Sequence, residues 1–344
     1  MSQLLKTPKS GSILSFGELL IRLCPDADGQ WLDEQQLSFY VGGAELNVAN
    51  ALALWQVPVK YFTALPDNNL SAQVVRYLQK KGIDTSVINF SGERIGLYYL
   101  TVGQDLKNAS LIYDRAGSSF SKLKTGSLDW DKILQGVGWF HFSAICPAIS
   151  QNVADICLEA VEAASKKGIT ISVDLNYRSK LWQYGKTPLQ VMPELVAHCD
   201  VVMGNVWAGE LMLGIDVIPD IHDAGQKDVY LQQSLKTSQR IIEQFPLCRA
   251  VANTFRFDAS NDIKYYTTLY TDNQLYHSAE FETDQVADKA GSGDCFMAGL
   301  IYGFYNQLPL QETLDFATAA AFQKLFIKGD ATGSTIADIK KAMK

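Results

Sequence analysis

Short apolar runs alternate along the chain with longer segments in which apolar residues recur at helical spacing. A short apolar run is typical of a strand buried on both faces, and a period of three to four residues is typical of a helix packed on one side. Strands that alternate with helices predict an α/β fold with a mostly parallel sheet flanked by helices. The predicted strands are Ile13–Phe16, Val59–Ala64, Gly138–Ser143, Thr170–Asp174, Val201–Gly204 and Ala250–Thr254, and the predicted helices are Ala44–Trp55, Ser71–Lys81, Asn152–Lys167, Pro188–His198 and Gln233–Phe245.

Two segments break this alternation, and two further segments stand outside it. Leu20–Tyr40 and Arg94–Arg115 alternate apolar with polar residues and are rich in aromatic residues, which predicts a small antiparallel sheet. Ile263–Ser278 contains the turn sequence Thr271-Asp272-Asn273-Gln274 and predicts a β-hairpin. Asp216–Lys227 is a polar insertion to which the pattern assigns no purpose.

Composition and charge exclude several classes of protein. The 344 residues suffice for one large α/β domain or two smaller ones, and 47% of them are hydrophobic. A net charge of −7 argues against a nucleic-acid-binding protein that depends on general basicity. No apolar run reaches the roughly 18 residues that span a bilayer. The first eleven residues lack the apolar stretch of a signal peptide, so we expect a flexible tail over 1–11 and a cytoplasmic protein.

Several chemical motifs are missing. The six cysteines are far apart, contain no CxxC pair and lie mostly in apolar runs, which favours buried free thiols over disulfides or a metal centre. There is no GxxxxGK[ST] phosphate loop, and no GxGxxG motif stands between a predicted strand and a helix. The sequence therefore predicts no protein metal centre and disfavours a dinucleotide-dependent oxidoreductase.

The segment Ala290-Gly291-Ser292-Gly293-Asp294 carries the clearest chemical signal, because an apolar run at helical spacing follows it at once. Backbone N–H groups of Gly291, Ser292 and Gly293 at a helix N-terminus can bind an anion. Asp294 beside them can accept the proton of a hydroxyl. This combination suits phosphoryl transfer to a hydroxyl, with Asp294 as general base and the N–H groups stabilising charge on the phosphoryl oxygens. The alternative is an ordinary helix start with Asp294 as a cap.

A second glycine turn, Gly42-Gly43, opens a predicted helix of small residues. The backbone of a glycine turn can approach a small polar ligand closely, and Asn47 offers both a donor and an acceptor. The alternative is that Asn47 only satisfies backbone groups at the helix start. Together the two glycine segments resemble the two signatures of the PfkB (ribokinase-like) family of carbohydrate kinases, in order and in spacing, and the resemblance extends over roughly Ser12–Met343.

The resemblance has implications for the whole chain. It implies a single ribokinase-like kinase domain over 12–340, with a β lid built from about 20–41 and 94–117 above the sugar site. It implies ATP as the phosphoryl donor, Mg²⁺ as its metal, and a homo-oligomer that assembles through the lid. Gly42, Gly43 and Asn47 are then expected to contact the sugar.

Tyrosines and arginines indicate which sugar is bound. Tyr113 and Arg115 are two residues apart, so on a strand they share a face, and Arg178 comes from another segment. Two arginines in one pocket suit a carboxylate, because a guanidinium fork matches its oxygens. The alternative is that each arginine forms a surface ion pair, such as Arg178 with Asp174. These segments are similar to the branch of the family that phosphorylates 2-keto-3-deoxygluconate, a sugar acid, in which tyrosines such as Tyr98 line the pocket.

The nucleotide side is assigned by the resemblance. Asn205 follows a predicted strand, at the carboxyl end where ligands of open sheets bind. The family usually has Asn-x-x-Glu here, whose acid helps to organise magnesium, but this chain has Ala208 in the acidic position and Glu210 two residues further on. For the other contacts a plain surface loop is the alternative. The predicted nucleotide contacts are Asn205, Gly291, Gly293, Thr254 and Arg256 after their strand, and Lys324 late in the last helix.

These observations favour an ATP-dependent sugar-acid kinase that converts 2-keto-3-deoxygluconate to its 6-phosphate. Two alternatives stay open. One is a neutral-sugar kinase, such as a fructokinase, and the other is a sugar-acid-binding protein with little catalysis, its metal-organising acid lost at Ala208. The expected partners are a small sugar acid and ATP, with no nucleic acid and no membrane.

Overall fold

The computed structural model describes residues 11–25, 31–32, 35–101, 111–219, 221, 226–259 and 262–343. The predicted N-terminal tail lies outside the described residues except for Gly11, and so does part of the 216–227 insertion.

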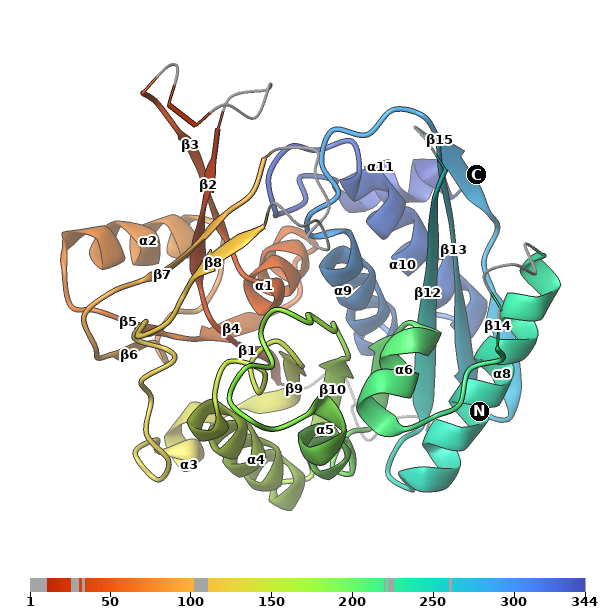
Figure 1. Ribbon diagram of the computed structural model, residues 1–344, viewed down its shortest axis with the longest axis horizontal. Coiled ribbons are helices and arrows are strands. Elements are labelled where there is room, and N and C mark those ends of the chain that lie inside the picture. The colour runs from red at the N-terminus through yellow and green to blue at the C-terminus, as the bar shows by residue number, and fades with distance from the viewer. Residues whose placement is uncertain are drawn as a thin grey trace.

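A nine-stranded sheet runs through the described part of the chain (Figure 1). Six adjacent strands are parallel, and the three strands that follow them along the chain are antiparallel additions at one edge. The order is β14 (Gln274–His277), β13 (Asp262–Thr271), β12 (Ala250–Ala259), β11 (Val201–Gly204), β10 (Thr170–Asp174), β9 (Val137–Ser143), β1 (Ser12–Phe16) and β4 (Val59–Phe62), and β15 (Phe281–Thr283) pairs with β13.

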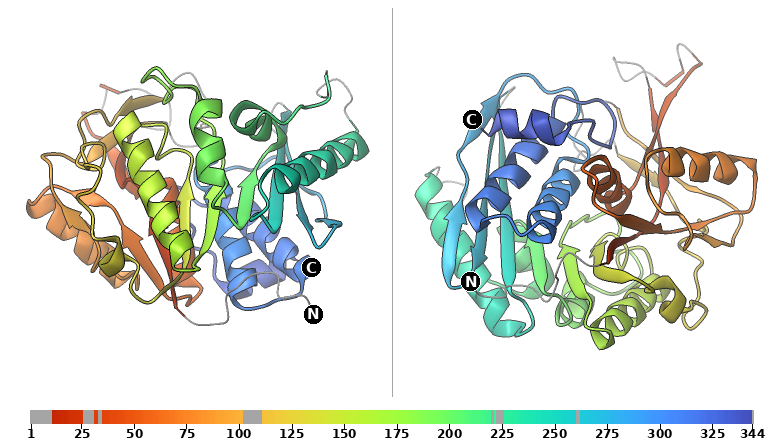
Figure 2. Two further views of the ribbon diagram at one scale, coloured as in Figure 1. Left: turned by 90° about the horizontal axis from the view of Figure 1, so that it is seen from below. Right: turned by 180° about the vertical axis from the view of Figure 1, so that it is seen from behind.

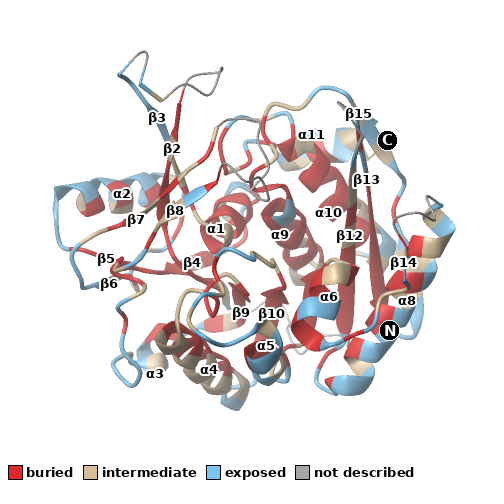
Figure 3. Ribbon diagram, in the orientation of Figure 1, coloured by how far each residue is buried: buried red, intermediate tan, exposed pale blue. Residues whose placement is uncertain are grey.

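Helices cover both faces of this sheet (Figure 2). Each face has its own apolar core, which explains why the central strands are apolar at successive positions (Figure 3). One core is built with α1 (Ala44–Leu54), α2 (Asn69–Lys80), α9 (Ser292–Tyr305), α10 (Leu310–Lys324) and α11 (Ile336–Ala342), and the other with α3 (Trp130–Ile133), α4 (Gln151–Lys166), α5 (Pro188–Val196), α6 (Val206–Leu213) and α8 (Lys227–Gln244).

The predicted pattern of alternating strands and helices is confirmed, with two differences in length that are larger than a shift of one or two residues at an end. β12 continues to Ala259 instead of ending at Thr254, because it pairs antiparallel with β13 along its whole length. α8 begins at Lys227 instead of Gln233. The predicted hairpin is formed by β13 and β14, and both residues of its tight turn have positive φ values.

A small four-stranded sheet lies at one side of the main sheet, in the segments for which a lid is predicted, and is called the lid below, although its role as a cover stays a prediction (Figure 1). Two of its pairings are antiparallel, whereas its central pair, β2–β7, is parallel. The register places Arg22, Tyr40, Tyr98 and Tyr113 side by side across the lid. The strands are β3 (Ser38–Gly42), β2 (Leu20–Cys24), β7 (Gly96–Tyr99) and β8 (Ile112–Asp114), and a separate pair consists of β5 (Ala64–Leu65) and β6 (Asn89–Phe90).

Two general expectations can be compared with the structure. All six cysteines are free and buried, as the sequence predicts. Within the described ranges, none of the helices has both the length and the apolarity that a bilayer span requires.

Candidate active site

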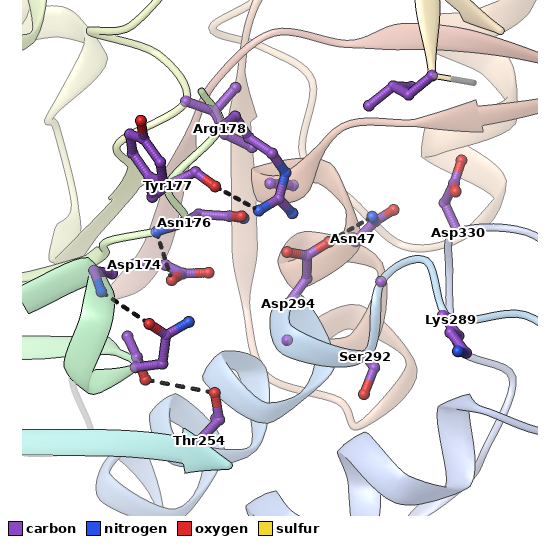
Figure 4. Close-up of a pocket in the computed structure, with 18 of the residues that line it drawn as sticks. Asn47, Asp174, Asn176, Tyr177, Arg178, Thr254, Lys289, Ser292, Asp294 and Asp330 are labelled. Carbon is purple, nitrogen blue, oxygen red and sulfur yellow. Dashed lines mark hydrogen bonds between the residues drawn. The ribbon is translucent and has the colours of Figure 1, made fainter. Parts of the chain in front are cut away.

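A cavity of about 720 Å³ lies where the parallel strands end at their carboxyl edge, beside the lid (Figure 4). Residues that follow β1, β10 and β11 line it, together with the first turns of α1 and α9 and the lid strands β7 and β8. Open parallel sheets bind their ligands at this edge. The cavity therefore brings together segments as far apart in the sequence as Glu18 and Asp330, which are 312 residues apart.

Asp294 lies in the first turn of α9 and is 7% exposed. Gly291 precedes the helix at φ 78°, and a Cβ there would overlap the Asp330 carbonyl oxygen at 1.9 Å. Gly291, Ser292 and Gly293 all line the cavity, as predicted, so the unpaired N–H groups of a helix start lie beside a carboxylate. The Ser292 hydroxyl takes no part, because it donates to the Ala321 carbonyl at 3.0 Å. Only the backbone of this loop is available to an anion.

Asn47 joins the two glycine segments. Its Nδ2 donates to Asp294 Oδ2 at 2.7 Å, and its Oδ1 is buried without a partner in the described chain. Buried polar atoms normally have a partner, so Oδ1 is placed to accept from a ligand hydroxyl. Gly43 lines the cavity at φ 133°. Gly42 does not line it, and a Cβ there would meet Asp330 Oδ2 at 2.4 Å, so this glycine makes room for a neighbouring carboxylate rather than for a ligand.

Two of the buried carboxylates that line the cavity, Asp294 and Asp174, have a pKa near neutrality. Burial raises the pKa of Asp294 to about 7, against the opposing effects of the Asn47 hydrogen bond and the Arg178 charge. Burial, followed by the nearby Asp294 charge, raises the pKa of Asp174 to about 7 as well. A carboxyl group whose pKa lies near neutrality is suited to act as a general base.

Arg178 points into the cavity toward Asp294 and Asn47 (Figure 4). Its Nη1 donates to the Tyr177 carbonyl at 2.9 Å, and its Nε is buried without a partner among the described residues. Within the same residues Arg178 forms no ion pair, so the alternative pairing with Asp174 is absent. Its positive charge is therefore available to an anionic ligand.

Arg115 lines the cavity but differs from the expected arrangement. Its Nε donates to Glu18 Oε2 at 2.7 Å, its Nη2 bonds the same oxygen, and both residues are buried. The guanidinium also lies over the ring of Tyr113, 5.6 Å from its centre. Because Glu18 neutralises Arg115, the two arginines are not equivalent, and no local pattern in the sequence indicates this pairing. The predicted contact of Arg115 with a sugar carboxylate stays a prediction.

A buried network connects the lid to the loop before α9. Tyr98 faces the cavity, and its hydroxyl donates to Asp330 Oδ2 at 2.7 Å. Arg22 of β2 is fully buried and donates to Asp330 at 3.1 Å and to Asp288 at 2.8 Å. Asp288 in turn accepts from the N–H of Ala290 at 3.2 Å. The sequence analysis did not identify Arg22. The signal that could have identified it is its position as the charged residue in the otherwise apolar strand β2.

The predicted nucleotide contacts are only partly brought together. Asn205 lines the cavity and caps α6, with its Oδ1 accepting from the Ala208 N–H at 2.8 Å. Thr254 and Arg256 also line it, but they lie within β12 rather than after a strand, on the same face. Lys324 does not line the cavity.

Lys324 is fully buried, and burial lowers its pKa. It ends α10, which α11 follows, so it does not lie in the last helix as expected. Its Nζ donates to the Ile327 carbonyl at 2.9 Å, and its Cε lies 3.4 Å from where a Cβ of Gly291 would be. The side chain therefore supports the glycine loop from behind, where a nucleotide has no direct access to it.

Few protein groups in the cavity are available to a metal. In the part of the chain that the structure describes, no group of three or more His, Cys, Asp or Glu side chains is arranged to hold a metal ion. Ala208 presents a buried methyl group to the cavity, and Glu210 is exposed and does not line it. Asp174 is the carboxylate that remains beside Asp294. These residues fit a magnesium ion that is bound mainly by nucleotide phosphates and water, with one protein carboxylate nearby.

A parallel sheet covered by helices, a cavity lined partly by a small second sheet, and an acid beside helix N-terminal N–H groups are typical of an α/β enzyme that acts on small anionic substrates. The chain belongs to the pfkB family of carbohydrate kinases, whose family model matches residues 10–240 and 264–336. The predicted family and fold are thereby confirmed, and the protein is a carbohydrate kinase, an enzyme that takes its phosphoryl group from ATP.

Three relatives illustrate the similarity. A 2-dehydro-3-deoxygalactonokinase of Haloferax volcanii is 25% identical over 345 residues, which is 97% of either chain. A 2-dehydro-3-deoxygluconokinase of Bacillus subtilis is 24% identical over 93% of this chain and 91% of its own length. The crystal structure of 2-dehydro-3-deoxygluconokinase from Thermotoga maritima has a TM-score of 0.87 and 31% identity, covering 97% of this chain and 99% of that one.

Proposed function

We propose that the protein phosphorylates the terminal hydroxyl of 2-keto-3-deoxygluconate (2-dehydro-3-deoxygluconate), with ATP as donor. One observation carries the substrate class: Arg178, a cation without an ion-pair partner in the described chain, points into the same cavity as the buried acid Asp294. The side chain is partly buried, with its Nε shielded from water and unpaired, and a sugar acid supplies the carboxylate that this guanidinium lacks, whereas a neutral sugar does not. The names of the three relatives support the same class of substrate.

The residues of the cavity account for each step of the transfer. Asp294 takes the proton from the terminal hydroxyl, whose oxygen forms the new bond to the γ-phosphorus as the bond to the β-phosphate oxygen breaks and ADP leaves. The N–H groups at the start of α9 stabilise the phosphoryl oxygens. Asn47 orients Asp294 and accepts from the sugar through its unpartnered Oδ1. Arg178 holds the carboxylate end of the substrate.

We further infer that the nucleotide enters as its magnesium complex. Magnesium neutralises phosphate charge when it is bound, and Asp174 is the protein carboxylate available to it. We also place the enzyme in the cytoplasm, since six buried free thiols suit a reducing compartment.

A panel of acceptors tests the substrate. The purified protein is assayed for ADP release with ATP, magnesium and 2-keto-3-deoxygluconate, its 4-epimer 2-keto-3-deoxygalactonate, fructose or ribose. We expect kcat/KM for the keto acids to exceed that for the neutral sugars by about 100-fold or more, the effect of one well-placed charge-assisted interaction. Phosphorus and carbon NMR of the product should place the new ester at C6. Fructose phosphorylated as efficiently as the keto acids would establish the neutral-sugar kinase instead.

We propose that the lid also assembles two copies of the chain. Its outer face presents a cross-strand row of apolar side chains, Phe39, Leu23, Tyr99 and Ile112, in which Phe39 is 63% and Ile112 57% exposed. Figure 3 shows β3 and the start of β8 coloured as exposed. An apolar patch on two edge strands is typical of a surface that a partner covers, and a second copy provides a matching patch.

Light scattering coupled to size-exclusion chromatography tests this assembly. The wild-type protein is expected to elute as a dimer or larger oligomer at micromolar concentration, and the double variant Phe39→Lys/Ile112→Lys as a monomer. Leu70→Lys, a substitution of an exposed leucine on α2, serves as the control and should leave the assembly intact. A monomeric wild-type protein contradicts the proposal.

A further inference from the structure

Three charged side chains form a cluster at the wall of the cavity. Asp258 lies between two cations: its Oδ2 is 3.0 Å from Lys289 Nζ, and its Oδ1 is 3.3 Å from Arg256 Nε. All three residues line the cavity. Arg256 and Asp258 are two residues apart on β12 and so share a face, whereas Lys289 comes from the loop that leads into α9.

We propose that Lys289 binds the phosphates of the nucleotide, and that its ion pair with Asp258 is the arrangement before the triphosphate binds. The inference rests on the proposed function only in taking ATP as the donor. In the absence of nucleotide, Lys289 pairs with Asp258. When the nucleotide binds, its phosphate oxygens replace the carboxylate as the partner of the Lys289 ammonium group.

The position of Lys289 in the chain supports this role. It stands two residues before Gly291 and five before Asp294, at the entrance to the loop whose N–H groups face the cavity. Figure 4 shows Lys289 near the segment that leads to Ser292 and Asp294. A flexible four-carbon side chain at this point can reach an anion that is bound at the start of α9.

Replacing the Lys289–Asp258 ion pair by a contact between Lys289 and phosphate should cost little free energy. The side chains of Lys289 and Asp258 are 22% and 35% exposed, and ion pairs that water reaches contribute little stability. A triphosphate carries several negative oxygens, so it competes well for the ammonium group. After the exchange Asp258 keeps Arg256 as its partner, so no carboxylate is left unpaired.

The negative charge of the cavity explains why a cation is needed at the position of Lys289. The acid that organises the metal in the resembling family is replaced by Ala208, and Asp174 and Asp294 add negative charge where a triphosphate must bind. A cation beside the glycine loop offsets this repulsion. Asp258, in turn, keeps the ammonium group oriented while the cavity holds no nucleotide.

Calorimetric titration with the ATP analogue AMP-PNP, without sugar, tests the inference on the full-length protein. Lys289→Met should weaken the binding about 10- to 30-fold and raise the KM for ATP similarly, with an unchanged KM for the sugar acid. Lys289→Arg should retain most of the affinity. Asp258→Asn should bind the analogue as tightly as the wild type, or up to about 3-fold more tightly, because the competing carboxylate is gone.

The outcomes separate this inference from the proposed function. If Lys289→Met binds the analogue as well as the wild type does, or if Asp258→Asn weakens it as much as Lys289→Met does, the cluster is only a structural ion pair and the inference is wrong. If the wild type itself binds no analogue, with or without magnesium, the nucleotide donor is wrong and the inference fails with it. Thermal unfolding of each variant shows whether a loss of binding follows a loss of folding.

Discussion

Replacing Asp294 by asparagine is expected to lower kcat by about 1,000-fold or more while the protein stays folded. The amide keeps the shape of the side chain but cannot take a proton from the attacking hydroxyl, and general base catalysis contributes roughly 100- to 10,000-fold. Steady-state kinetics with 2-keto-3-deoxygluconate and ATP provide the measurement. A variant that keeps more than about a tenth of the wild-type kcat would show that Asp294 is not the base.

The pH dependence of the wild type provides an independent check on Asp294. Because burial raises its pKa to about 7, kcat/KM should rise with pH through about 7 and level off above it. Asp174→Asn removes a neighbouring negative charge and should move this rise to lower pH. A flat profile between pH 6 and 8 would contradict the assignment.

Thermal unfolding at several pH values completes the comparison. The folded-state pKa of Asp294 lies above the ordinary value of 3.8, so the stability due to this group is fully present below about pH 4 and is lost as the pH rises through 7. Asparagine does not ionise. The Tm of Asp294→Asn should therefore equal or exceed that of the wild type above pH 7.

The second large effect is expected for Arg178→Ala, which should lower kcat/KM for the sugar acid by about 10- to 150-fold. The substitution removes the cation that lacks an ion-pair partner among the described residues, and a charge-assisted hydrogen bond contributes about 1.5–3 kcal/mol. It should also raise the pKa of Asp294, since the Arg178 charge now lowers it. Kinetics over a range of pH measure both effects.

A comparison of acceptors separates the contact of Arg178 with the substrate carboxylate from its effect on Asp294. The loss caused by Arg178→Ala should be larger for the sugar acid than for fructose, because the effect on Asp294 is common to all acceptors. An equal loss for both would mean that Arg178 does not bind the carboxylate.

Arg115→Ala is the corresponding substitution of the other arginine in the cavity. It leaves Glu18 buried without its ion-pair partner, so it should lower the Tm markedly, and Glu18→Gln in the same chain should restore much of that loss.

Local pattern was enough to predict most of the fold. Buried parallel strands need apolar residues at successive positions, so β10 and β11 have the bounds that the sequence predicts. The end of β12 was missed because the strand is extended by pairing with β13, which comes later in the chain. Alternation of Phe255 and Phe257 with polar residues was the signal that the strand continues.

In the predicted site, too, local features could be predicted from the sequence and long-range contacts could not. Gly291 and Asp294 could be assigned from their motif, because a helix start beside an acid is a local arrangement. The partners of the other charged residues could not. Glu18 is 97 residues away from Arg115, and Asp258 is 31 residues away from Lys289, so only folding shows that each pair is in contact.

The amino-acid sequence by itself determined the order of strands and helices, the glycine loops and the position of Asp294 at a helix start, because each depends on neighbours within a few residues. Only the tertiary structure decided which cations remain available to a ligand. It pairs Arg115 with Glu18 and Lys289 with Asp258, and it leaves Arg178 facing the cavity without a carboxylate partner in the described chain. Electrostatic interactions act through space, so the distances between side chains, and not their order along the chain, set the charge of the cavity.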